Sequence, residues 1–155
     1  MSMEQILDAV RAFDGVLELA PAEGGPYPEI AWGDHFFYYA PDGEVPENTQ
    51  PYATIVTKDY PDDSGSRLGG GRWRLNVHVG RQRFVDLLGT DPRDASADDY
   101  SAADVVLPHP VYGPLGWISI VDPADRTMPL ALELLAAAHA DARTRAERRD
   151  RHPST

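Results

Sequence analysis

The chain has 155 residues, no cysteine and a formal net charge of −11 at pH 7. This length suits one domain with its own core, and the missing cysteines exclude disulfides, thiolate metal sites and cysteine nucleophiles. Residues 1–140 carry a net charge of −13 and residues 141–155 carry +2, so the body of the protein is acidic and disfavours nucleic acid as a partner.

The first third of the chain predicts one helix followed by short strands. Apolar residues at helical spacing, with Gly15 behind them, indicate a helix over residues 3–13. Enrichment in β-branched and aromatic residues predicts strands over residues 16–19, 29–32, 35–40 and 52–58. A tight turn at Gly33-Asp34 is expected to join the second strand to the third.

The middle of the chain combines a glycine-rich loop with an alternating strand. Composition predicts a mobile loop over residues 60–71, and a short helix over residues 84–88 that Gly89 closes. Between them, residues 72–79 alternate between an apolar and a polar face. The apolar face consists of Trp73, Leu75, Val77 and Val79, and the polar face of Arg72, Arg74, Asn76 and His78.

The last third predicts a strand and a long helix after a stretch with little regular structure. Residues 90–104 allow at most one helical turn, and three prolines exclude a regular element from residues 105–114. A strand is expected over residues 115–121. Thr127 is expected to cap a final helix that frays among the C-terminal arginines.

The order of these elements predicts an α+β fold. We expect a two-layer sandwich, in which a curved, mostly antiparallel sheet carries the N-terminal and C-terminal helices on one side. Residues 1–150 are expected to form a single domain, followed by a disordered tail over residues 151–155.

The polar face of the strand over residues 72–79 is the best candidate for a binding site. A band of donors from Arg72, Arg74, Asn76 and His78 suits a carboxylate or phosphate group, and Lys58 with Asp34 completes the candidate ligand-binding set. The alternative is the ordinary solvated face of an antiparallel sheet.

A second candidate is acid–base chemistry. Asp34-His35 and Lys58-Asp59 place unlike charges near strand ends, where neighbouring strands would let them converge. The simpler interpretation is that these groups close turns. No sequence motif predicts a catalytic residue, and the histidines and aspartates show no metal-binding spacing, so neither a metal nor a cofactor is expected.

The N-terminus and the hydropathy pattern bear on location. Residues 1–8 carry acidic groups where a signal peptide needs basic ones, and no apolar run reaches the roughly 20 residues of a membrane span. We therefore expect a cytoplasmic protein with no membrane partner.

Four segments resemble a bacterial family of domains of unknown function over nearly the whole chain. They read Trp-Gly-Asp-x-Phe-Phe-Tyr-Tyr at 32–39, Ala-Thr-Ile-Val-Thr-Lys-Asp-Tyr-Pro at 53–61, Arg-Leu-Asn-Val at 74–77 and Leu-Pro-His-Pro-Val-Tyr at 107–112. The order of features resembles, more distantly, the MmcQ/YjbR-like proteins. That resemblance implies a curved antiparallel sheet and DNA binding. The negative charge of residues 1–140 argues against DNA binding.

These observations favour a small cytoplasmic binding or regulatory domain without catalytic activity. The expected partner is a small anionic ligand or another protein. Two alternatives stay open: a DNA-binding protein of MmcQ/YjbR type, and an enzyme that uses an acid–base cluster of Asp34, His35, Lys58 or His78.

Overall fold

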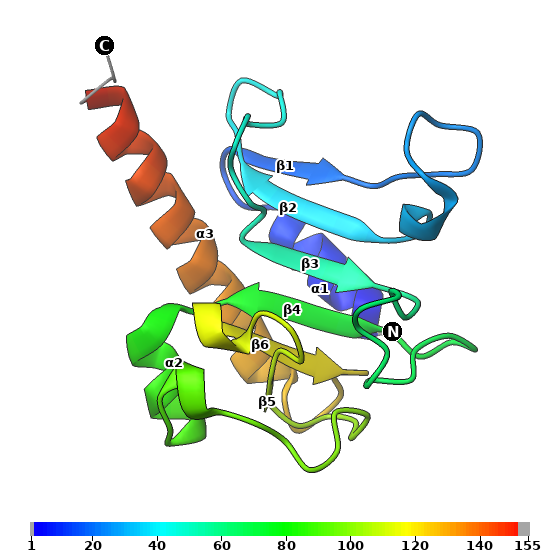
Figure 1. Cartoon of the computed structure of the whole chain (residues 1–155). Coiled ribbons are helices and arrows are strands. Elements are labelled where there is room, and N and C mark those ends of the chain that lie inside the picture. Colours follow the sequence, from blue (N-terminus) through cyan, green and yellow to red (C-terminus); the bar gives the residue numbers. More distant parts are fainter. Residues whose placement is uncertain (1, 152–155) are drawn as a thin grey trace.

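The computed structural model describes residues 2–151, in which six strands form one open, curved sheet (Figure 1). The strands are β1 (Val16–Leu19), β2 (His35–Tyr39), β3 (Ala53–Val56), β4 (Arg74–His78), β5 (Leu107–Pro108) and β6 (Trp117–Val121). Their order in the sheet is β1-β2-β3-β4-β6-β5, and all neighbouring strands run antiparallel. The predicted α+β class is therefore confirmed.

Two helices cover one face of the sheet, as expected (Figure 1). They are α1 (Ser2–Arg11) and α3 (Met128–Arg151), while the shorter α2 (Gly80–Leu88) lies beside β6. The apolar face of β4 supplies Leu75 and Val77 to the core, where both are fully buried. The two-residue period of the strand directs these side chains to the helices and turns Arg74 and Asn76 the other way.

The polar face of β4 is not open to solvent. Arg74 and Asn76 are each only 2% exposed, because the loops that follow β3 and precede β6 lie across them. Ser66, from the first of these loops, is fully buried. The loop over residues 60–71 has no helix or strand, as predicted, but it packs on the sheet; its mobility stays a prediction.

Two expectations for local structure were wrong. Residues 29–32 do not form a strand, because β2 pairs directly with β1, and the segment instead forms the 3-10 helix η1 (Glu29–Ala31). Residues 105–114 do contain regular structure, namely β5 and the 3-10 helix η3 (Gly113–Leu115). Pro108 is tolerated there because β5 is an edge strand, where a missing backbone N–H breaks no ladder.

The helix predictions need smaller corrections. α2 begins four residues earlier than predicted, at Gly80, and the expected strand over residues 115–121 begins at Trp117 because η3 takes up Leu115. Residues 90–104 contain one helical turn, η2 (Pro92–Asp94), as expected.

α3 continues through the C-terminal arginines to Arg151, the first residue of the predicted disordered tail. The rest of the tail, residues 152–155, lies outside the described residues. Over residues 2–151, no helix combines the length and apolar character needed to cross a membrane.

Candidate functional site

A cavity of about 650 Å³ lies on the face of the sheet that points away from α1 and α3. Its floor comes from alternate residues of β2, β3, β4 and β6, because every second side chain of a strand points to the same face. Phe36, Thr54, Asn76 and Trp117 are among these floor residues. The walls come from η1 and from the loops that follow β3 and β5.

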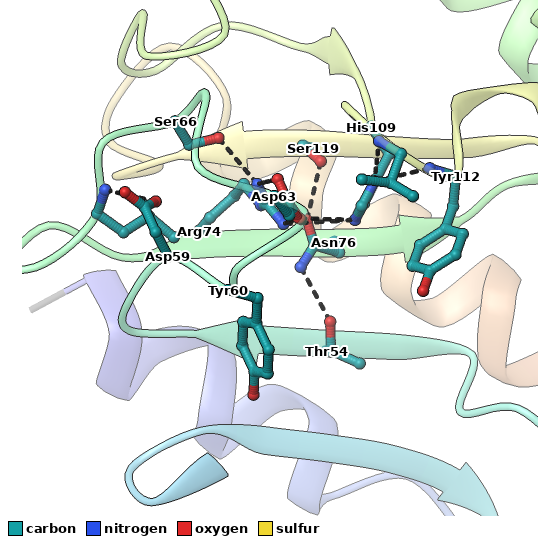
Figure 2. Close-up of polar contacts among 12 residues, drawn as sticks. Thr54, Asp59, Tyr60, Asp63, Ser66, Arg74, Asn76, His109, Tyr112 and Ser119 are labelled. Atoms are coloured by element: carbon teal, nitrogen blue, oxygen red, sulfur yellow. Dashed lines mark hydrogen bonds and ion pairs between the residues drawn. The ribbon is translucent and has the colours of Figure 1, made fainter. Parts of the chain in front are cut away.

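The strand register aligns a row of polar side chains across this floor. Thr54 lies opposite Asn76, and Asn76 lies opposite Ser119. Asn76 donates from Nδ2 to the hydroxyl of Thr54 over 3.0 Å, and its Oδ1 accepts from Ser119 over 2.8 Å (Figure 2). The row holds the Asn76 amide in one orientation, since its oxygen is bound on one side and its nitrogen on the other.

Arg74 is held in place by the loop that covers it. Its guanidinium forms a two-bond pair with Asp63 at 3.0 and 2.5 Å, and it also donates to Ser66 and Asn76 over 2.8 Å each (Figure 2). Burial alone would raise the pKa of Asp63, but hydrogen bonds from Arg74 and the charge of Arg74 outweigh it and hold that pKa below its ordinary value. The carboxylate of Asp63 therefore neutralises the positive charge of Arg74.

His109 completes the polar end of the cavity from the segment after β5. Its Nδ1 accepts from the backbone N–H groups of Val111 and Tyr112 over 3.0 Å each (Figure 2). Burial, with the nearby charge of Arg74, lowers the pKa of His109 to about 3, although Asp63 acts in the opposite direction. The ring is therefore neutral near pH 7, and because Nδ1 is an acceptor we assign its proton to Nε2.

This assignment leaves two donors facing each other. Nε2 of His109 lies 3.4 Å from Nη2 of Arg74, and both atoms carry hydrogen. The nearest carboxylate oxygen to Nε2, Oδ2 of Asp63, is 3.9 Å away, beyond hydrogen-bond length. The polar end of the cavity thus presents two buried N–H groups with no shared acceptor between them.

The other parts of the cavity are aromatic and apolar. Phe36 and Tyr38 of β2 form part of the floor, and Tyr60 and Tyr112 stand on either side of Thr54 in Figure 2. Leu115 lines the cavity and is 67% exposed. The cavity therefore joins a polar end to an aromatic end, and its exposed lining includes the apolar Leu115 and the polar Gln50 and Asp62.

Asp34 and Lys58 do come together, next to the cavity. Asp34 is fully buried, and it accepts from the backbone N–H and the hydroxyl of Thr57 over 2.8 Å each and from the hydroxyl of Tyr60. Lys58 donates to Asp34 over 3.4 Å and to the carbonyls of Ile30 and Trp32 over 2.6 Å each.

These contacts use all three N–H groups of the Lys58 ammonium. Lys58 and Asp34 thus hold η1 against the end of β3 through hydrogen bonds. The side chain of Asp34 thereby bridges strand ends, which is close to the turn-closing interpretation made from the sequence. Tyr60, bonded to this carboxylate, presents its ring to the cavity.

The other predicted residues lie outside the cavity. Arg72 donates from Nη2 to the carbonyls of Ser66 and Ser101 at 3.2 and 2.6 Å. His78 contacts the ring of Trp117 at the end of β4. His35 points to the helix face and bonds with Glu18 over 2.6 Å. The proposed acid–base cluster is thus divided between the two faces of the sheet.

Several residues of the site were not predicted from the sequence. Asp63, Ser66 and His109 are brought to Arg74 by loops, whereas Thr54 and Ser119 are placed by strand register. The available signal was the run of polar residues inside apolar strands, since a buried polar side chain needs polar neighbours.

Four arginines on and near β4 and α2 each form an ion pair with a carboxylate. The ion pairs are Arg72 with Asp122 at 4.0 Å, Arg74 with Asp63 at 2.5 Å, Arg81 with Asp91 at 2.8 Å and Arg83 with Asp141 at 2.7 Å. Within residues 2–151, no group of three or more His, Asp or Glu side chains is placed to hold a metal ion.

Comparison with known proteins adds one match. A family model, described as "Family of unknown function (DUF6194)", covers residues 1–151 of the chain. No curated protein and no solved structure matches.

Proposed function

The chain belongs to the DUF6194 family of unknown function, and we propose that it is a binding domain that takes one small organic molecule into the cavity without transforming it. The observation that carries the proposal is the pair of buried N–H groups on Arg74 and His109, 3.4 Å apart, with no acceptor between them. Nη2 of Arg74 already donates one hydrogen to Asp63, so its second hydrogen and the Nε2 hydrogen of His109 are the two that have no acceptor. A buried N–H without an acceptor is costly, and an acceptor atom of a ligand would satisfy both.

The shape of the cavity supports a small molecule as the occupant. Ligand sites are concave, mostly apolar and supplied with a few placed polar groups, and a volume of about 650 Å³ falls in their usual range. An oxygen of the ligand would accept from Arg74 and His109, while its apolar body would lie on Phe36 and Tyr38. The small anionic ligand expected from the sequence is one member of this class.

The same contacts argue against catalysis. The lone pair of Nδ1 of His109 is occupied by two backbone donors, and Nε2 already carries a proton. Lys58 has no free N–H group. Asp63 is paired with Arg74, and its lowered pKa makes it a weak base.

DNA binding has less support, because residues 1–140 carry a net charge of −13 and because Arg72, Arg74, Arg81 and Arg83 are each paired with a carboxylate. A cytoplasmic location and a protein partner stay predictions.

A thermal-shift screen with a cavity-blocked variant tests the proposal. Ligand at 100 times its dissociation constant adds about 2.7 kcal/mol of stability, which raises the melting temperature. Ala31 lines the cavity on η1, so Ala31→Phe narrows it without touching the polar end. The matched control, Ala22→Phe, lies on an exposed loop outside the cavity lining.

We expect compounds that stabilise the wild type and Ala22→Phe but not Ala31→Phe. Two results would contradict a ligand in this cavity. One is a library without such compounds, and the other is a set of compounds that stabilise Ala31→Phe as much as the wild type.

A further inference from the structure

We infer that the ligand carries an uncharged carbonyl-type acceptor, such as a carboxamide or a ring carbonyl, on a flat aromatic body. This inference rests on the proposed function and names the ligand class of the same cavity. It follows from three features of the described residues: the charge at the polar end, the number of donors there and the aromatic side chains beside it.

The charge at the polar end disfavours a second anion. Arg74 is the only cationic side chain among the cavity-lining residues of the described chain, and the Asp63 carboxylate already meets it through two bonds. Asp62 adds another negative charge to the lining. A ligand carboxylate between Arg74 and His109 would therefore stand beside the Asp63 carboxylate and be repelled by it.

The donor pattern requires an acceptor with two lone pairs. Nη2 of Arg74 and Nε2 of His109 both offer hydrogen toward the same space, 3.4 Å apart. A carbonyl oxygen accepts two hydrogen bonds and carries no hydrogen of its own, so it satisfies both donors. An ammonium group would meet two donors and the guanidinium charge, and the polar end therefore excludes amines.

The aromatic residues define the body of the ligand. Phe36 and Tyr38 lie on the floor, and the rings of Tyr60 and Tyr112 extend on either side of Thr54 (Figure 2). Aromatic side chains gain most from flat rings that stack on them or meet their edges. A bicyclic ring system with one carbonyl substituent could contact the aromatic end with its rings and the polar end with its carbonyl oxygen.

Two probes of the same shape separate charge from fit. The compounds 2-naphthamide and 2-naphthoate share an aromatic body and a carbonyl, and they differ in charge at pH 7. Isothermal titration of the wild type is expected to give an affinity at least about tenfold higher for 2-naphthamide. Equal or tighter binding of 2-naphthoate overturns the inference and leaves the proposed function standing.

Absence of binding by both probes also overturns the inference. The proposed function is then decided separately by the library screen, which does not depend on these compounds.

Two variants test whether the carboxylate of Asp63 sets the preference between the two probes. Asp63→Asn removes the carboxylate that neutralises Arg74, so the preference should shift toward 2-naphthoate by about tenfold or more. Asp62→Asn changes the net charge equally, but Asp62 is exposed and has no bond to Arg74, so the preference should shift by clearly less than in Asp63→Asn. An unchanged preference in Asp63→Asn would contradict the charge argument.

His109→Asn tests the second donor and does not depend on the folding of Asp63→Asn. The Asn side chain places an oxygen near the position of Nδ1, so it still accepts from the backbone of Val111 and Tyr112. The Nε2 donor is lost, and 2-naphthamide should bind about tenfold more weakly. An unchanged affinity, with backbone NMR shifts preserved, shows that His109 does not contact the ligand.

Discussion

The change Asp63→Asn is expected to lower the free energy of unfolding by about 3 kcal/mol, although it replaces one oxygen by nitrogen. Arg74 is 2% exposed and depends on both carboxylate oxygens. An asparagine keeps one acceptor, but its N–H groups face Nη2. Breaking a buried pair costs about 3–5 kcal/mol, and we take the lower end because Ser66 and Asn76 still accept from the guanidinium.

Urea unfolding followed by tryptophan fluorescence measures this loss, since Trp73 is buried in the core. Asp62→Asn is the matched control, because Asp62 is exposed, and it should stay within about 0.5 kcal/mol of the wild type. The double change Asp63→Leu with Arg74→Met removes both charges and should recover most of the loss, to within about 1 kcal/mol of the wild type. A loss for Asp63→Asn no larger than that of the control would refute the role of the pair.

Three further changes test other parts of the structure by the same unfolding measurement. Asp34→Ala leaves four donors around a fully buried position and should cost about 3 kcal/mol or more, so a loss under about 1 kcal/mol would contradict this account. The unfolded state takes up a proton on His109 near pH 6.5 and the folded state only near pH 3. Stability therefore falls on acidification, and between pH 8 and 5.5 the wild type should lose about 1 kcal/mol more than His109→Asn; equal slopes would exclude a buried neutral ring. Gly116→Ala and Gly43→Ala both strain a positive φ, of 87° and 79°, but only at Gly116 would the new Cβ lie 3.1 Å from the backbone of Gly80. Gly116→Ala should thus cost about 1–3 kcal/mol more, and equal costs would show that the close approach is unimportant.

The sheet could be predicted from the sequence because its strands carry local signals. The alternation over residues 72–79 gave the correct faces of β4, and the spacing of apolar residues gave α1 and α3. The prediction for residues 29–32 was wrong because the segment has the composition of a strand, whereas its conformation depends on contacts with residues distant in the sequence. Lys58, nearly thirty positions later in the chain, binds the carbonyls of Ile30 and Trp32.

The candidate site could be predicted only in part, for the same physical reason. Arg74 and Asn76 were found because they interrupt an apolar pattern in a strand. Nothing local to them indicates that Asp63 and His109 would cover them, since those contacts depend on the paths of two loops. A polar strand face can be solvated or covered, and the sequence contains the same alternation in both cases.

Crystallographic screening with small aromatic amides and acids tests the central claim most directly, because it shows where compounds bind and how. We expect aromatic fragments in the cavity beside Phe36 and Tyr38, each with a carbonyl oxygen between Nη2 of Arg74 and Nε2 of His109. Fragments bound only elsewhere, or an Asp63 carboxylate that accepts from Nε2 and closes the gap, would contradict it.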